Sequence, residues 1–103
     1  MINNINLNGV IHMKTLSDFK RALTLGTKWK NAWYDIDGNM VERPIAEVVQ
    51  IKTTGVKFRR IQEGVACESW FYFPKASDFA IDNDIAKIYR KDSMNLILKY
   101  QLA

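Results

Sequence analysis

Residues 56–73 read VKFRRIQEGVACESWFYF, two apolar-rich runs on either side of a Glu-Gly pair. Both runs contain β-branched and aromatic residues, which are enriched in strands. Strands over 56–62 and 65–73, joined by a turn at Glu63-Gly64, would pair antiparallel because the connection is so short. This hairpin predicts a protein built mainly from an antiparallel sheet.

Upstream of the hairpin, the sequence predicts one helix over 15–25. Thr15 and Asp18 have the spacing of a capping box, and apolar residues then follow the helical period. Gly26 occupies the position where a helix commonly ends in a left-handed residue. From 27 onward the period changes to two, which indicates a strand over 27–34.

The segment after this strand is predicted to turn at Asp37-Gly38, the strongest short hairpin signal in the chain. Proline has no backbone N–H and is excluded from central strand positions. We therefore expect the next strand to begin only after Pro44 and to cover 45–52.

The C-terminal part predicts a short helical turn over 75–79 and a last hairpin of 85–90 and 94–102. The expected fold class is α+β, with one N-terminal helix packed on a twisted antiparallel meander sheet of about five to six strands. Residues 1–12 are expected to form a flexible N-terminal arm, and 13–103 a single α+β domain.

The composition is that of one globular domain, with 103 residues of which 48% are apolar and 25% charged. No apolar run approaches the roughly 18 residues that would indicate a membrane span. The first residues have neither the basic start nor the apolar stretch of a signal peptide. The single cysteine excludes an intrachain disulfide. Together these features predict a cytoplasmic protein that does not bind membranes.

The candidates for chemistry are few. His12, the only histidine, lies in the expected arm, where a general base would lack a positioned partner. Cys67 has apolar or small neighbours on its strand face, so we expect it to be buried as a small apolar residue. Asp35 would begin a calcium loop, but Met40 and Ala46 occupy the positions that require glycine and glutamate.

Phosphate-binding, dinucleotide-binding and nucleophile-elbow motifs do not occur in the sequence. We therefore expect no enzymatic activity, no catalytic residue, no metal and no cofactor. A small enzyme or ligand-binding barrel stays an alternative, because a sequence does not reveal whether a sheet encloses a polar pocket.

Aromatic side chains are the first candidates for binding a partner. Alternation along a strand would place Trp70 and Tyr72 on the face opposite Phe71, and Trp and Tyr are the favoured anchors of protein interfaces. The predicted partner-binding residues are Trp33, Tyr34, Trp70 and Tyr72.

Basic side chains give an alternative. The net charge is +4, and pairs of cations share one side of strands 27–34 and 56–62. If those strands pair, the cations form a stripe of the kind that tracks nucleic-acid phosphates. The residues of this nucleic-acid alternative are Lys28, Lys30, Lys57, Arg59 and Arg60. The simpler interpretation is that they occupy the solvated face of the sheet.

Two stretches, MKTLSDFKRALTLGTKW at 13–29 and ESWFYFPKASDF at 68–79, resemble small uncharacterised proteins of bacteriophages and other mobile elements, anti-CRISPR proteins among them. The resemblance implies a module that binds a host protein, such as a nuclease or nucleoprotein complex, and blocks it sterically. It covers less than a third of the chain and assigns no catalytic or binding residue.

We therefore expect a non-enzymatic protein-binding module, an inhibitor of a bacterial defence system such as CRISPR-Cas. A nucleic-acid-binding domain that uses a basic sheet face is the alternative. An exposed edge strand would also allow two copies to pair as a homodimer.

Overall fold

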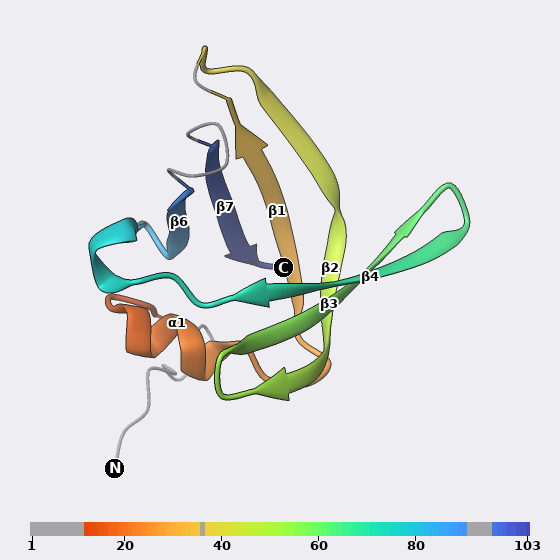
Figure 1. Cartoon of the computed structure of the whole chain (residues 1–103), viewed down its shortest axis with the longest axis horizontal. Helices are drawn as coiled ribbons and strands as arrows, with labels where there is room; N and C mark the ends of the chain where they lie inside the picture. Colours follow the sequence, from red (N-terminus) through yellow and green to blue (C-terminus); the bar gives the residue numbers. More distant parts are fainter. Residues whose placement is uncertain (1–11, 36, 91–95) are drawn as a thin grey trace.

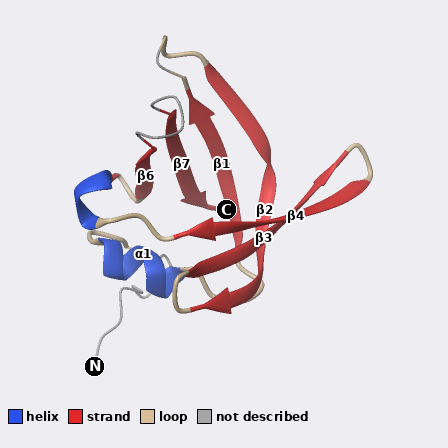
Figure 2. Cartoon of the chain, in the orientation of Figure 1, coloured by secondary structure: helices blue, strands red, loops and turns tan. Residues whose placement is uncertain are grey.

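The computed structural model describes residues 12–35, 37–90 and 96–103. Within these ranges the chain forms a short α-helix, a single 3-10 turn and seven strands in one antiparallel sheet (Figures 1 and 2). In chain order the elements are α1 (Leu16–Ala22), β1 (Lys28–Tyr34), β2 (Met40–Lys52), β3 (Gly55–Gln62), β4 (Val65–Tyr72), η1 (Ala76–Asp78), β5 (Phe79–Asp82), β6 (Ile85–Arg90) and β7 (Leu96–Leu102).

The sheet has the strand order β4-β3-β2-β1-β7-β6-β5. It consists of two meanders, β1 to β4 and β5 to β7, joined where β7 pairs with β1. The α+β class is confirmed, but the described sheet has seven strands instead of five to six and is not one continuous meander. The strand missing from the sequence prediction is β5, an edge strand of only four residues.

The sheet curls around α1, which packs against its concave face (Figures 1 and 2). Phe19 of α1 is completely buried there and contacts the rings of Trp29 on β1 and Phe71 on β4. It also contacts Phe79 on β5 and Tyr100 on β7. One helical side chain thus holds together strands from both ends of the sheet.

The start of α1 agrees with the predicted capping box. The Asp18 backbone N–H donates to Thr15 Oγ1 over 3.1 Å, and the Thr15 N–H donates to the Asp18 carboxylate over 3.1 Å. The helix ends at Ala22 instead of 25, because the Leu23 backbone already leaves the helical region. Gly26, at φ +84°, forms the turn into β1, where its N–H donates to the Val48 carbonyl.

Removing the cap should weaken the fold measurably. Thr15→Ala leaves the first-turn N–H groups without their acceptor, and we expect the free energy of unfolding to fall by about 1 kcal/mol. Ser17→Ala, two residues on at an exposed position of the same helix, should change it by less than about 0.5 kcal/mol. Urea titrations measure the free energy of unfolding of both variants. Equal losses of this free energy in the two variants would contradict the capping role.

The expected exclusion of Pro44 from a strand was wrong. β2 runs through it, at a bulge where Trp29 pairs with Ala46 but Asn31 pairs with Arg43. A bulge needs no ladder hydrogen bond from its extra residue, so proline is accommodated there. The Pro44 carbonyl accepts a hydrogen bond from Asn31 Nδ2 over 2.9 Å.

The two predicted turns are confirmed. Gly38 and Gly64 both have positive φ, +82° and +79°. At the first turn the Asp35 carboxylate accepts from the backbone N–H groups of Asp37 and Asn39. The Asn39 side-chain amide is the main cause that lowers the pKa of Asp35, followed by the backbone bonds. The Asp35 carboxylate therefore stabilises the turn at Asp37-Gly38.

The expected N-terminal arm lies almost wholly outside the described residues. Met13 is buried, and its N–H donates to the Asp84 carboxylate over 2.7 Å, which ties the first described residues to the turn between β5 and β6. Among the described residues, no helix is long and apolar enough to cross a membrane.

Candidate functional site

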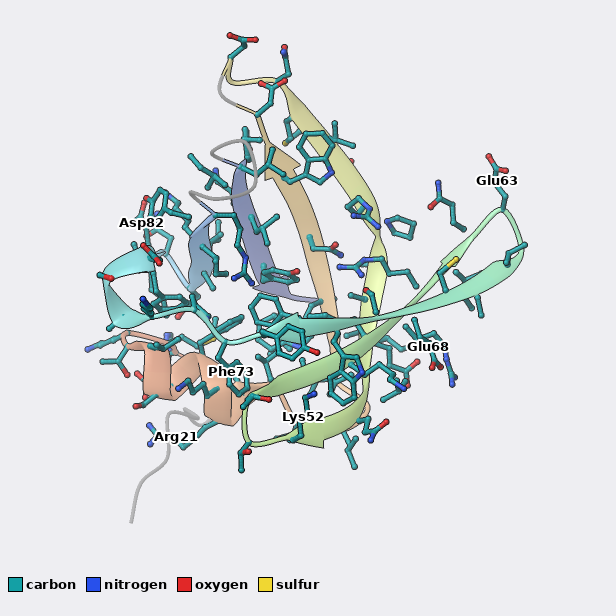
Figure 3. The ribbon with its side chains drawn as sticks, viewed as in Figure 1. Arg21, Lys52, Glu63, Glu68, Phe73 and Asp82 are labelled. Carbon is teal, nitrogen blue, oxygen red and sulfur yellow. The ribbon has the colours of Figure 1, made fainter. Side chains whose placement is uncertain are left out.

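The hairpin of β3 and β4 projects from the rest of the sheet. The two strands pair along their whole length, from Gly55↔Tyr72 to Gln62↔Val65. β2, however, follows β3 only as far as Arg59. Beyond that point the hairpin has no other neighbour in the sheet, and Figure 3 shows Glu63 at its tip, far from the body. All residues from 61 to 69 are exposed as a result.

Alternation along these two strands sorts their side chains into two faces. Val56, Phe58 and Phe71 point to the concave face and are buried in the core. The opposite, convex face of the hairpin carries a row of exposed or half-buried side chains. We call this row the convex strip, and its members are Lys57, Arg59, Ile61, Ala66, Glu68, Trp70 and Tyr72.

The end of the convex strip nearest the body is aromatic. The rings of Trp70 and Tyr72 stack with their centroids 6.4 Å apart. Lys52 from β2 places its Nζ 4.1 Å from the Trp70 centroid and 4.8 Å from that of Tyr72 (Figure 3). Lys57 Nζ lies 5.2 Å from Trp70. Half of the Tyr72 surface is still exposed, so the stack forms an amphipathic platform under two cations.

The middle of the convex strip is charged. Glu68 accepts from Arg59 Nε over 3.0 Å and from Arg59 Nη2 over 2.9 Å. Its other oxygen lies 3.9 Å from Lys57 Nζ. One carboxylate therefore holds two of the cations that the nucleic-acid alternative assigned to phosphate.

The outer end of the convex strip is apolar. Ile61 is 64% exposed, and its partner across the hairpin is the exposed Ala66. A shallow groove of about 340 Å³ adjoins this end and is lined by Ile61, Ile45 and Arg59 together with Lys28 and Glu47. Apolar, charged and aromatic side chains thus follow one another along one exposed ridge.

The four predicted aromatic anchors are not all brought together. Trp70 and Tyr72 form one stack, whereas Trp33 and Tyr34, adjacent on β1, point to opposite faces of the sheet. Both of these are half-buried, and Lys99 Nζ lies 4.4 Å from the Tyr34 ring centroid.

The predicted basic set is also divided. Lys28 and Lys30 lie on β1, and β2 separates them from Lys57 and Arg59 on β3. The register places Glu47 of β2 between Lys28 and Arg59. The two basic strands do not pair directly, so the condition for a continuous stripe is not met, and carboxylates interrupt it.

Arg60 lies on the opposite face from the other members of that set. It is 8% exposed, and its Nε and Nη2 donate to Asn31 Oδ1 over 3.1 and 2.8 Å. Burial is the main cause that lowers the pKa of the Arg60 guanidinium. Consecutive residues of a strand point to opposite faces, so the Arg59-Arg60 pair itself carried this signal.

The expectation of a buried Cys67 was wrong, because this residue is exposed. It pairs with Arg60 in the part of the hairpin that projects beyond β2. His12 is exposed, and its Nδ1 lies 3.4 Å from the Asp84 carboxylate.

No protein-family model, curated protein or solved structure matches this chain. Within the described ranges, no group of three or more His, Cys, Asp or Glu side chains is placed to hold a metal ion. The geometry of the hairpin is therefore the basis for assigning a function.

Proposed function

We propose that this protein is a non-enzymatic protein-binding module and that the convex strip is its interface. The observation that supports the proposal is the projecting hairpin, which exposes an apolar tip, a charged centre and a Trp–Tyr stack along one ridge. Protein interfaces characteristically combine an aromatic or apolar centre with a polar rim. Trp, Tyr and Arg are also the residues that most often dominate binding energy.

The convex strip is held ready for binding. Eight residue pairs join β3 to β4, and the stack of Trp70 on Tyr72 is fixed by the cations above it. Side chains that are already ordered lose little conformational entropy when they bind. A partner can therefore dock on the hairpin without first rearranging it.

The shifted ionisable groups are explained without catalysis. Among the described residues with a resolved shift, Asp35 owes its lowered pKa to the turn that it caps. Burial is the main cause of the lowered pKa of Arg60 and of the raised pKa of Tyr100. None of the three forms the pair of nucleophile and base that covalent catalysis requires.

The charge of the strip favours an acidic partner surface. Lys57 and Arg59 share the carboxylate of Glu68, and Lys52 adds a third cation over Trp70, so the platform and the centre of the strip carry net positive charge. Complementary charge raises association rates and excludes wrong partners. As the partner we propose a component of a bacterial defence system, blocked sterically by the docked hairpin; this narrower choice depends on the sequence resemblance alone.

A nucleic-acid partner is the less favoured alternative. Phosphate contacts would have to displace the Glu68 carboxylate from Lys57 and Arg59. Binding dominated by phosphate contacts weakens steeply as salt rises. Salt and nuclease sensitivity therefore separate the two alternatives.

The test is a pull-down from a bacterial lysate with the whole chain as bait. We expect a stoichiometric protein to remain bound after nuclease treatment and a high-salt wash. Tyr72→Ala should weaken its affinity about 30-fold, the effect of a loss of about 2 kcal/mol at an interface anchor. Tyr89→Ala removes an exposed tyrosine of β6 and should weaken affinity less than about threefold.

Two results would count against the convex strip. One is the recovery of nucleic acid alone, released at high salt. The other is a bound protein whose affinity is insensitive to Tyr72→Ala and to Ile61→Ser, since these substitutions alter the two ends of the strip.

A further inference from the structure

The concave face of the sheet holds an open cavity of about 420 Å³, which Trp70 and Tyr72 of the convex strip also help to line. Its described lining includes three arginines from three different strands: Arg43 of β2, Arg60 of β3 and Arg90 of β6. The buried rings of Phe58 and Phe71 line it on the side of the core. Ser69 and Tyr100 supply neutral hydroxyl groups.

The three arginines share the cavity with Tyr100. Desolvation is the largest influence on this phenol and raises its pKa. Arg60, Arg90 and Arg43 each act in the opposite direction and lower it. Arg43 also lowers the pKa of Arg60. All three arginines and Tyr100 line the same cavity, which agrees with these influences.

The described residues provide no anion for this cluster. No Asp or Glu is among the described residues that line the cavity, and none of the described carboxylates forms an ion pair with its arginines. Neutral groups hold the arginines instead: Asn31 accepts from Arg60, and the Tyr72 carbonyl accepts from Arg90 Nη2 over 3.0 Å. The cavity therefore concentrates positive charge beside a low-dielectric wall.

Such an arrangement is unfavourable for folding by itself. Arg60 is buried with no counter-ion among the described residues, which costs free energy, and the half-buried Arg90 and the exposed Arg43 add repulsion. Natural sequences keep local conflicts of this kind mainly at functional sites. A bound anion would remove the conflict.

We propose that this cavity binds a phosphate monoester, with Arg43, Arg60 and Arg90 as its cations and the Tyr100 hydroxyl as a further donor. The planar fork of a guanidinium matches phosphate oxygens in a bidentate manner. A phosphate monoester has three terminal oxygens and a charge of about −1.5 to −2 near neutral pH, whereas a carboxylate has two oxygens and one charge. The cavity volume lies in the range of about 300–1,000 Å³ found for small-molecule sites.

This site shares Trp70 and Tyr72 with the convex strip, but its three arginines are not members of that strip. Ile61→Ser, at the other end of the strip, tests partner binding without altering a residue that lines the cavity. If the cavity did not bind phosphate, the proposal that the convex strip is a protein interface would still stand.

The test is a calorimetric titration of the whole chain with phenyl phosphate at fixed ionic strength. We expect saturable binding at one site, at least tenfold tighter than that of benzoate, which presents a carboxylate on the same ring. Arg43→Gln should weaken phenyl phosphate at least tenfold. Lys30→Gln removes one exposed cation from the convex face of β1 and should change affinity less than twofold. Because Arg43 is exposed, its replacement should leave the fold intact.

A second arm separates the sources of the phosphate. A mononucleotide and a 5′-phosphorylated oligothymidylate represent a free metabolite and a nucleic-acid end, and tight binding of either supports the proposal. An unphosphorylated strand that binds as tightly as the phosphorylated one would overturn it. Three other results would also overturn it. Benzoate could bind as tightly as phenyl phosphate, Arg43→Gln and Lys30→Gln could lose the same affinity for phenyl phosphate, or the titration with phenyl phosphate could fail to saturate.

Discussion

Replacing Phe19 with alanine is expected to lower the free energy of unfolding by about 4 kcal/mol, within the range for truncating a buried phenylalanine. The ring has no exposed surface, and its centroid lies 5.6 Å from that of Trp29 and 5.4 Å from that of Phe79. These partners belong to β1 and to the start of β5, so the alanine would leave a void where the sheet curls around α1. A domain of this size has a total stability of only about 5–15 kcal/mol.

Urea denaturation followed by tryptophan fluorescence measures this loss. Leu25→Ala, in the same segment but 64% exposed, is the matched control and should cost less than about 0.5 kcal/mol. A loss below about 2 kcal/mol for Phe19→Ala would show that the helix is not the centre of the core.

Gly55→Ala is expected to be the second most damaging single change, at about 3 kcal/mol. Gly55 begins β3 opposite Tyr72, and its backbone approaches β4 so closely that a Cβ atom would overlap the carbonyl oxygen of Phe71. Because this obstacle is backbone, no side-chain rotation relieves it. β3 and β4 must therefore separate at the end of the hairpin where β3 still pairs with β2.

Gly64→Ala is the matched control for this prediction. A Cβ at Gly64 has no atom within 4 Å, but the residue has φ +79° in the turn between β3 and β4. An alanine there should cost only about 1 kcal/mol, the penalty of a left-handed conformation. The urea midpoints of the two variants give their relative stability. A larger loss of stability for Gly64→Ala than for Gly55→Ala would contradict the steric explanation.

Local signals explain the parts of the fold that the sequence predicted correctly. The capping box of Thr15 and Asp18 and the turn at Glu63-Gly64 each depend on residues a few positions apart, where side-chain chemistry dictates the backbone. Alternation likewise predicted that Trp70 and Tyr72 share a face, which is the aromatic end of the convex strip.

The features that were wrong or missed depend on contacts far along the chain. Pro44 is tolerated because β2 has a bulge there opposite β1, and Cys67 is exposed because β2 stops short of the hairpin tip. The concave cavity takes one arginine from each of three strands that lie far apart in sequence. The positions of Arg43 and Arg90 in the sequence do not predict that both line one cavity.

The pairing of β7 with β1 has a consequence for how the molecule folds. The central seam of the sheet joins the first strand to the last, whereas β1, β2, β3 and β4 each pair with the strand that follows or precedes them in the sequence. A high contact order of this kind slows folding, because the long loop must close before its contacts contribute. The β1–β4 meander is therefore expected to form early, with its concave apolar surface open until β7 arrives. During that interval the chain is most exposed to aggregation, and a chaperone that covers the unfinished face would act then.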